Sequence, residues 1–378
     1  MYYYKTVNIG KLFNWYKNED QSHTLDTVNW MSERMCKEEN SLGTEEYEEF
    51  PYDVEIVAED LFVPWAMDIT KDGRIFFTEK NGNIRLIENG VLQTNSIYTF
   101  LPPFEALGEG GLLGLVLDPD FDNNGYFYVM YTYMDDSEYL SRVVRMHYDR
   151  EHTVEDKVLV DSIPANRVHI GGRLKIGPDG KLYVTTGDAG MPELSQDISS
   201  LAGKILRMNL DGTIPSDNPF PDSYVYAFGI RNSQGLDWND NKVLYASEHG
   251  DIAHDEINII LPGGNYGWPL KEGDFIKPLY DSGNETYAPS GIAFAKGGPF
   301  NGRLFISTLR GSQLLVMELS EDGNQVLNTN GYLKNEYGRL REAFGASDGS
   351  VYITTSNLDG RGLPNPQDDK IIRLVPRY

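Results

Sequence analysis

Two residues in the stretch RVHIGGRLKIGPDGKLYVTTGD, residues 167–188, are of types that perform acid/base chemistry. His169 precedes Gly171 and Gly172, and Asp188 follows the strand-like run KLYVTTG. A carboxylate bonded to one imidazole nitrogen fixes the tautomer and leaves the other nitrogen free as a base, while the glycines let a flat ligand approach the backbone. The stretch therefore predicts either a general base with its orienting acid at the mouth of a pocket, or a surface turn with an incidental histidine.

A second group of polar residues lies in the segment Tyr226–Pro269. Arg231, Asn232 and Gln234 stand beside an expected turn, and polar density on loops is typical of binding sites. Farther along come His249, Asp251, His254, Asp255 and Glu256. Because acids outnumber imidazoles and no HExxH pattern is present, oxygen-rich coordination of calcium fits this group better than zinc. A merely solvated acidic loop is the alternative.

Three arginines stand apart in this acidic sequence: Arg310, Arg339 and Arg341. If they face a common channel, they could hold the carboxylates of a ligand through charge-assisted hydrogen bonds. The alternative is that they are exposed arginines on strands.

These residues need a scaffold, and a recurring pattern indicates one. The pattern begins with a turn that contains Gly or Asn, continues with a short apolar and aromatic run, and ends with a polar residue. It occurs in KDGRIFFTEK, NNGYFYVMYTY, PDGKLYVTTGD, NDNKVLYASEHG, FNGRLFISTLRG and SDGSVYITTSN. Successive copies lie roughly 50 to 60 residues apart, which suits a four-stranded blade with its loops. We therefore predict a six-bladed β-propeller with four-stranded antiparallel blades, with a β-sandwich as the alternative.

In such a radial array, equivalent strand ends fall on the same face. The residues that follow the repeated runs should therefore ring one mouth of the central channel, where polar groups converge into a candidate site. These residues are Glu79, Asp188, His249, Arg310 and Asn357.

The composition favours strands over long helices. The 378 residues include 38 glycines, 24 tyrosines and 16 phenylalanines, and short apolar runs alternate with Asp-Gly and Asn-Gly turns. We therefore expect an all-β protein.

The net charge of −24 argues against binding to nucleic acid or to anionic lipid, because both are themselves negatively charged.

The N-terminal part differs from the rest of the chain. Cys36 is the only cysteine, which excludes an intrachain disulfide and a thiolate metal site. The first residues lack the apolar core of a signal peptide, and no later run is long enough to span a bilayer. The segment from Glu38 to Thr70 contains many acidic residues and no Lys or Arg. We predict an extension and acidic linker over residues 1–52 and the propeller over residues 53–378.

Several motifs together resemble a known family. They are VPWAMDITKDGRIFFTEKNGNIRLI, GEGGLLGLVLDPDF, HIGGRLKIGPDGKLYVTTGD, LAGKILRMNLDGTIPSDNPF, FGIRNSQGL, DEINIILPGGNYGWP and GRLREAFGASDGSVYITTSNLDGRG. From about Leu61 to Pro376 the chain is similar to the glucose/sorbosone dehydrogenases, and most similar to their aldose sugar dehydrogenase branch. The resemblance implies a six-bladed propeller that binds pyrroloquinoline quinone (PQQ) and calcium and oxidises the anomeric carbon of aldoses to lactones.

The resemblance also implies roles for individual residues. His169 matches the catalytic base that takes the sugar hydroxyl proton while hydride leaves for the quinone, and Asp188 matches the acid that orients it. Arg231 matches the arginine beside the quinone oxygen that becomes negative on reduction. Asn232 and Gln234 match its neighbours in the cofactor pocket.

Other matched positions concern the anionic groups of the cofactor. Arg310, Arg339 and Arg341 match basic residues that pair with the carboxylates of the quinone. Glu109 stands where relatives often have glutamine near the quinone, so a carboxylate at this position could weaken binding of an anionic cofactor.

The resemblance implies two calcium sites. Gly250 and Asp251 match the positions whose backbone carbonyls hold the catalytic calcium. Glu256 and Tyr266 match a second site with a structural role.

The resemblance also bears on the partners, the location and the oligomeric state of the protein. The resemblance implies an aldose substrate, an unidentified electron acceptor, an extracytoplasmic location and, without the long insertions of the dimeric branch, a monomer. A calcium-dependent lactonase or other hydrolase and a non-catalytic binding module are the alternative functions, because six-bladed propellers also serve these purposes.

Overall fold

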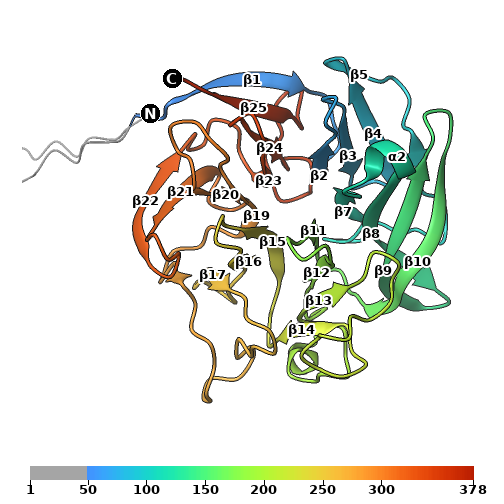
Figure 1. The fold of residues 1–378 in the computed structure, drawn as a ribbon, viewed down its shortest axis with the longest axis vertical. Coiled ribbons are helices and arrows are strands. Elements are labelled where there is room, and N and C mark those ends of the chain that lie inside the picture. Colours follow the sequence, from blue (N-terminus) through green and yellow to red (C-terminus); the bar gives the residue numbers. More distant parts are fainter. Residues whose placement is uncertain (1–48) are drawn as a thin grey trace, which may run out of the picture. The chain divides into compact units, whose positions relative to one another are not determined.

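The computed structural model describes residues 49–378, which form a ring of six β-sheets (Figure 1). Each sheet is a blade of four antiparallel strands that run in order from the centre of the ring to its rim, and one blade carries a fifth, short strand. The predicted all-β, six-bladed propeller is therefore confirmed. No helix among these residues is long and apolar enough to cross a membrane.

Blades 1 to 3 follow one another along the chain. Blade 1 contains β2 (Pro64–Ile69), β3 (Ile75–Glu79), β4 (Asn83–Glu88), β5 (Val91–Leu92) and β6 (Tyr98–Thr99). Blade 2 contains β7 (Leu112–Leu117), β8 (Tyr126–Asp135), β9 (Glu138–Tyr148) and β10 (Thr153–Pro164), with the short helix α2 (Phe121–Asn124) between β7 and β8. Blade 3 contains β11 (Gly171–Ile176), β12 (Leu182–Thr186), β13 (Lys204–Met208) and β14 (Val225–Phe228), with the 3-10 helix η2 (Pro192–Ser195) between β12 and β13.

Blades 4 to 6 complete the ring. Blade 4 contains β15 (Ser233–Trp238), β16 (Leu244–Glu248), β17 (Glu256–Ile259) and β18 (Tyr280–Asp281). Blade 5 contains β19 (Pro289–Phe294), β20 (Leu304–Thr308), β21 (Gln313–Leu319) and β22 (Val326–Tyr332). Blade 6 contains β23 (Leu340–Gly345), β24 (Val351–Thr355), β25 (Ile371–Pro376) and β1 (Tyr52–Ala58).

The ring is closed by pairing between the two ends of the described chain. Strand β1 is the outermost strand of blade 6 and pairs antiparallel with β25, with Tyr52 opposite Pro376. The propeller thus begins at Tyr52, one residue before its predicted start. Of the predicted extension over residues 1–52, residues 1–48 lie outside the part of the chain that the structure describes.

Each sequence repeat corresponds to one structural position. The repeated runs form β3, β8, β12, β16, β20 and β24, the second strand of each blade. Strands β3, β12, β16 and β20 are buried along their whole length. Each strand therefore begins with an uninterrupted run of three apolar residues rather than an alternating pattern, because neighbouring blades cover both faces.

Close contact between blades requires glycine in the inner strands. Gly114 of β7 lies against the backbone of Gly172 in β11, and Gly235 of β15 lies against that of Ser290 in β19. A Cβ atom at either glycine would overlap the neighbouring carbonyl oxygen. The six inner strands consequently pack side by side around the axis.

The antiparallel order places two sets of loops on one face, here called the mouth face. It carries the loops after the second strand of each blade and the connections from one blade to the next. His169 lies in the connection from blade 2 to blade 3, and Asp188 follows β12. The two residues therefore reach the same face from different blades, as the predicted ring of strand ends requires.

Candidate active site

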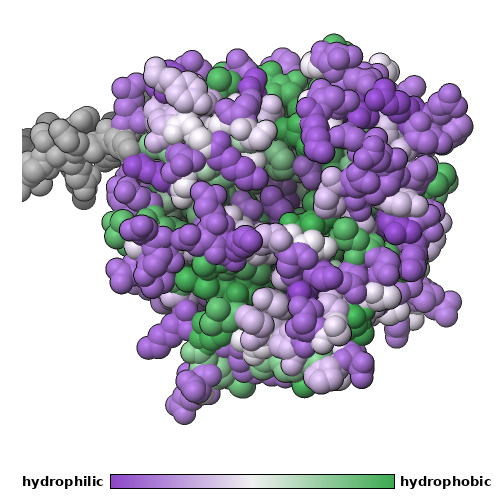
Figure 2. Space-filling view, viewed as in Figure 1, coloured by the Kyte–Doolittle hydropathy of each residue, from purple (hydrophilic) through white to green (hydrophobic). Residues whose placement is uncertain are grey.

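A polar pocket lies at the mouth face, with a volume of about 420 Å³ including its open end. The view in Figure 2 shows a mainly hydrophilic face that is hollowed near the centre of the ring. The inner strands β2, β11, β15 and β23 and several mouth-face loops contribute to the wall. The lining residues are Trp65, Lys80, Gly108, Glu109, Ile170, Gly171, Gln234, His249, Leu309, Arg341, Asp359 and Arg361.

His169 stands directly before the wall residues Ile170 and Gly171 and has a backbone conformation that is rare for a side chain larger than glycine. Its φ angle is +55°, which is sparsely populated and is maintained only where the surroundings enforce it. Its N–H donates to Oε2 of Glu109 at 2.8 Å, and its carbonyl accepts from the N–H of Ala189 at 3.1 Å. These two bonds fix the strained backbone.

The ring of His169 is paired with Asp188, as predicted. Nδ1 of His169 lies 2.7 Å from Oδ1 of Asp188, whose side chain is fully buried. The same carboxylate accepts from the N–H of Gly190 at 2.7 Å and from Nε1 of Trp268 at 2.8 Å. Because Asp188 accepts both of these hydrogen bonds, the arrangement favours the tautomer in which Nδ1–H of His169 donates to it as well.

The other ring nitrogen of His169, Nε2, is not engaged by Asp188. Nε2 has no hydrogen-bond partner within residues 49–378, and 19% of the side chain is exposed. A neutral imidazole with an unprotonated, accessible Nε2 can accept a proton from a bound hydroxyl group. The geometry is that of a general base oriented by an acid.

Arg231 is held beside this pair. Its carbonyl accepts from the N–H of Asp188 at 2.8 Å, and its guanidinium lies 5.3 Å from the ring centroid of Trp268. Nη1 and Nη2 make long contacts of 3.4 Å with the carbonyl of His249 and with Asp251. Its buried Nε has no partner in the described chain, which leaves a fixed cation with hydrogen-bonding capacity beside the candidate base.

Glu109 and Asn232 connect the base to the pocket wall. The side-chain amide of Asn232 accepts from the N–H of Gly171 at 3.0 Å and contacts Glu109 at 3.4 Å. Burial alone would raise the pKa of Glu109, but the charge of Arg361 and the hydrogen bonds that Glu109 accepts from Arg361 and from the N–H of His169 lower it. Glu109 is therefore an ionised group in the wall.

His249 is the second histidine of the pocket. Its Nδ1 contacts the amide of Asn232 at 3.3 Å and its Nε2 lies 3.0 Å from the carbonyl of Pro289. Burial lowers the pKa of His249 to about 4. The ring is therefore neutral at neutral pH, and it adds no positive charge to the wall.

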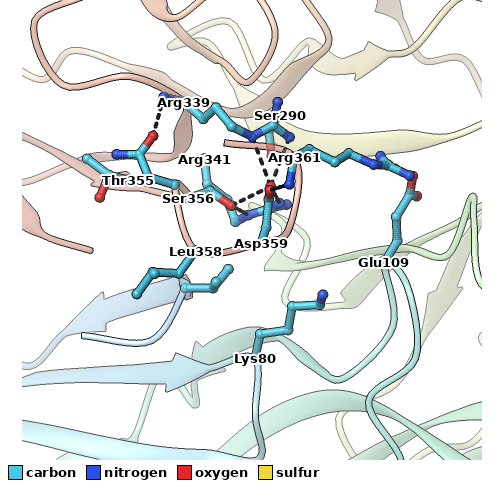
Figure 3. A network of polar contacts seen from close by, with 12 residues as sticks. Lys80, Glu109, Ser290, Arg339, Arg341, Thr355, Ser356, Leu358, Asp359 and Arg361 are labelled. Atoms are coloured by element: carbon cyan, nitrogen blue, oxygen red, sulfur yellow. Dashed lines mark hydrogen bonds and ion pairs between the residues drawn. The ribbon is translucent and has the colours of Figure 1, made fainter. Parts of the chain in front are cut away.

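Two of the three predicted arginines belong to one cluster, drawn in Figure 3. Oδ2 of Asp359 accepts from Nη2 of Arg339 at 2.8 Å, from Nη2 of Arg341 at 3.3 Å and from Ser356 at 2.9 Å. Nη1 of Arg341 donates to the side chain of Gln234 at 3.2 Å. The arginines are thus fixed in place by a carboxylate of this chain.

The structure separates Arg310 from this cluster. Arg310 is exposed and is not among the residues that line the pocket, whereas its neighbour Leu309 is. Glu79 and Asn357 lie on the mouth face but are engaged within the fold, by Arg85 at 3.2 Å and by the carbonyl of Tyr337 at 2.9 Å. Of the predicted ring, His249 lines the pocket and Asp188 contacts the ring of His169.

Sequence reasoning missed three charged residues of the wall: Lys80, Asp359 and Arg361. All three lie in loops after second strands, β3 for Lys80 and β24 for the other two. The signal was available, because that loop position was predicted to face the mouth. Only the first polar residue after each run was considered.

The predicted calcium region lies between β16 and β17. Glu248 and Glu256 both accept from the side-chain amide of Asn258, at 3.1 and 3.0 Å, and the buried oxygen of that amide has no partner in the described chain. Burial and the other carboxylate raise the pKa of Glu248, and burial raises that of Glu256. The hydroxyl of Tyr266 is occupied, since it donates to the carbonyl of Ile259 and accepts from the N–H of Leu261. Residues 49–378 contain no cluster of three His, Cys, Asp or Glu side chains that could hold a metal.

Comparisons with known proteins agree with this architecture. A model of the glucose/sorbosone dehydrogenase family matches residues 61–365. Quinoprotein glucose dehydrogenase B of Acinetobacter calcoaceticus is 33% identical over 312 residues, which cover 68% of this chain and 64% of that protein. Aldose sugar dehydrogenase YliI of Escherichia coli is 29% identical over 343 residues, which cover 82% and 91%. A structure of the PQQ-bound form of aldose sugar dehydrogenase from Streptomyces coelicolor aligns with a TM-score of 0.78 and 36% identity over 86% of this chain and 98% of that one.

Proposed function

The chain belongs to the glucose/sorbosone dehydrogenase family, and from this premise we propose that it is a PQQ- and calcium-dependent aldose sugar dehydrogenase with His169 as its general base. The single observation that carries the proposal is the 2.7 Å contact between His169 and buried Asp188, with Nε2 of the imidazole left free. The names of the relatives supply the reaction class, and the paired residues supply its proton acceptor.

The proposed reaction removes two hydrogens from the anomeric carbon and its hydroxyl group. Nε2 of His169 takes the hydroxyl proton as the C1–H bond breaks, and the carbon–oxygen bond becomes the carbonyl of a lactone. When bound, the quinone with its calcium ion supplies the acceptor for the hydride. The resulting imidazolium is stabilised by the ionised carboxylate of Asp188, which its Nδ1–H continues to contact.

The residues beside the base fit an anionic, flat cofactor. Arg231 offers a buried Nε without a partner in the described chain, and a fixed cation of this kind stabilises negative charge that develops near it. Gly171 in the pocket wall has a φ of +71° and no space for a Cβ. Together with Asn232 and Gln234, these residues would hold the cofactor.

The arginine cluster fits the carboxylates of such a cofactor. Arg339 and Arg341 are fixed by Asp359 at 2.8 and 3.3 Å. Burial lowers the pKa of Arg341 only to about 10, so it stays charged at neutral pH. Exposed Arg310 would have to turn inward to contribute.

The donor set also fits calcium rather than a softer metal. The proposed catalytic site uses the backbone carbonyls of Gly250 and Asp251, which supply the oxygen ligands that calcium prefers. The proposed second site uses Glu256 and the carbonyl of Tyr266. Half-buried Glu256, whose pKa is raised by burial, and the buried amide oxygen of Asn258, which has no partner in the described chain, support this proposal, because a cation would satisfy both acceptors.

Reduction of an artificial electron acceptor tests the proposal. Purified apoprotein is mixed with glucose or another aldose, with PQQ and calcium added separately and together. We expect turnover only when both are present. If a panel of aldoses gives no reduction of the acceptor, in protein shown to be folded by circular dichroism, the proposal is overturned. Hydrolysis of lactones by the same sample would favour the hydrolase alternative.

A further inference from the structure

The pocket carries more positive than negative charge although the chain has a net charge of −24. Its wall contains three basic side chains, Lys80, Arg341 and Arg361, and two carboxylates, Glu109 and Asp359. An excess of positive charge at the centre of an acidic protein marks a place where an anionic group can be bound.

The two carboxylates of the wall are already engaged. Asp359 is shared by Arg339 and Arg341, and Oε1 of Glu109 accepts from Nη1 of Arg361 at 2.7 Å. No carboxylate within residues 49–378 therefore forms an ion pair with Lys80.

Lys80 retains unused hydrogen-bonding capacity. Its ammonium group donates to the carbonyl of Gly108 at 2.5 Å, and this is one of the three hydrogens that an ammonium carries. Burial, reinforced by the charge of Arg341, lowers the pKa of Lys80. In Figure 3 its amine points toward the space between Asp359 and the pair formed by Arg361 and Glu109.

Arg361 can complete an anion site from the other side of this space. Its side chain is 56% exposed, and its contact with Glu109 joins the loop after β24 to the connection before β7. A guanidinium pairs with a carboxylate through two parallel hydrogen bonds, whereas an ammonium acts as a point charge. An incoming carboxylate would therefore compete with Glu109 for Arg361 while it neutralises Lys80.

We propose that Lys80 and Arg361, with Arg341 behind them, form a carboxylate-binding subsite of the pocket. The inference rests on the proposed function and extends it to residues that the family resemblance did not supply. The carboxylate belongs either to the quinone cofactor or to an acidic sugar substrate such as a uronic acid. The wall beside the subsite is apolar at Trp65, Ile170 and Leu309, so it suits a carboxylate attached to an uncharged body.

Two substitutions of one residue separate charge from packing. Lys80→Met removes the charge and keeps the aliphatic stem, and Lys80→Arg restores the charge. Lys71→Met is the matched control, because Lys71 is 85% exposed in the turn between β2 and β3, on the face opposite the mouth. Thermal unfolding of the three variants establishes that each is folded.

The first arm measures binding of PQQ by equilibrium dialysis in the presence of calcium, without substrate. If the carboxylate is that of the cofactor, we expect the Kd of Lys80→Met to rise about tenfold, the loss of one charged hydrogen bond, and that of the other two variants to stay within about threefold. The second arm compares kcat/KM for glucuronate and glucose at saturating PQQ. If the carboxylate is that of the sugar, Lys80→Met loses about tenfold for glucuronate only.

The outcomes separate the subsite from the proposed function. If wild-type protein binds PQQ and Lys80→Met matches it in both arms, the subsite is wrong and the proposed function stands. Wild-type protein that neither binds PQQ nor oxidises either sugar would overturn the proposed function and the subsite with it.

Discussion

Replacement of His169 by alanine tests the proposed base most directly. The substitution removes Nε2 of His169, which has no hydrogen-bond partner within residues 49–378, while Asp188 keeps two of its three contacts, Gly190 and Trp268. A positioned general base contributes about 10²- to 10⁴-fold to a rate, or ~3–5 kcal/mol of transition-state stabilisation. We therefore expect kcat to fall by about 10²- to 10⁴-fold.

Cofactor binding should respond much less than turnover. The backbone N–H of residue 169, which donates to Glu109 at 2.8 Å, is retained in the alanine variant, so the pocket wall keeps its anchor. Steady-state reduction of an artificial acceptor gives kcat, and equilibrium dialysis of PQQ gives the Kd, which we expect to change less than about threefold. His152→Ala is the matched control, since His152 is 73% exposed beside Asp149. A kcat within a factor of three of wild type would refute the assignment of the base.

Three further predictions concern charge within the ring. Arg231→Ala should weaken PQQ binding and slow turnover by about 10- to 100-fold, the loss of a charged hydrogen bond, and unchanged values in dialysis and acceptor reduction would remove Arg231 from the site. Arg173 and Glu342 form a fully buried ion pair between blades 3 and 6, so Arg173→Met should lower the free energy of unfolding by about 3–5 kcal/mol, because it leaves a buried charge unpaired. The double variant with Glu342→Gln should recover most of this loss in urea unfolding, and equal losses in both proteins would contradict the argument. Because the pKa of His249 is lowered to about 4 on folding, the unfolded state binds the proton more readily between that value and about 6.5. Stability should therefore be full above about pH 6.5 and decline by up to ~3 kcal/mol as the pH falls through 4, whereas His249→Gln should lack this component in urea unfolding at each pH.

The fold was predictable because its information is local and repeated. Each turn and second strand is encoded within about twelve residues, and burial on both faces makes the apolar runs continuous, as in β12 and β20. Closure by β1 was not predicted, although the boundary at Asp53 came within one residue of Tyr52. Pairing of β1 with β25 joins the two ends of the described chain and leaves no local signal.

The site was predictable where a single turn positions the side chains. His169 and Asp188 flank the antiparallel hairpin of β11 and β12, so this local pairing brings the two ends together. Lys80 and Asp359 follow second strands, so their place at the mouth was predictable, but their proximity to each other depends on blades 1 and 6 meeting at ring closure. Arg310 shows a related limit. It was predicted to face the channel, but Arg310 is exposed, and its neighbour Leu309 lines the pocket instead.

The distribution of charge is compatible with the proposed binding of an anionic cofactor by an acidic protein. At physiological ionic strength the influence of exposed charges fades over about 8 Å, so the net charge of −24 acts mainly on the approach of an anion and little within the pocket. Inside, Arg341 is buried and Lys80 is half-buried, so their interactions with a bound group are screened much less than those of exposed charges. Selection of an anion therefore depends on direct contact with groups such as Lys80 and Arg341, and not on attraction from a distance. For the same reason, a change in one wall residue should alter binding more than a change of surface charge of equal size.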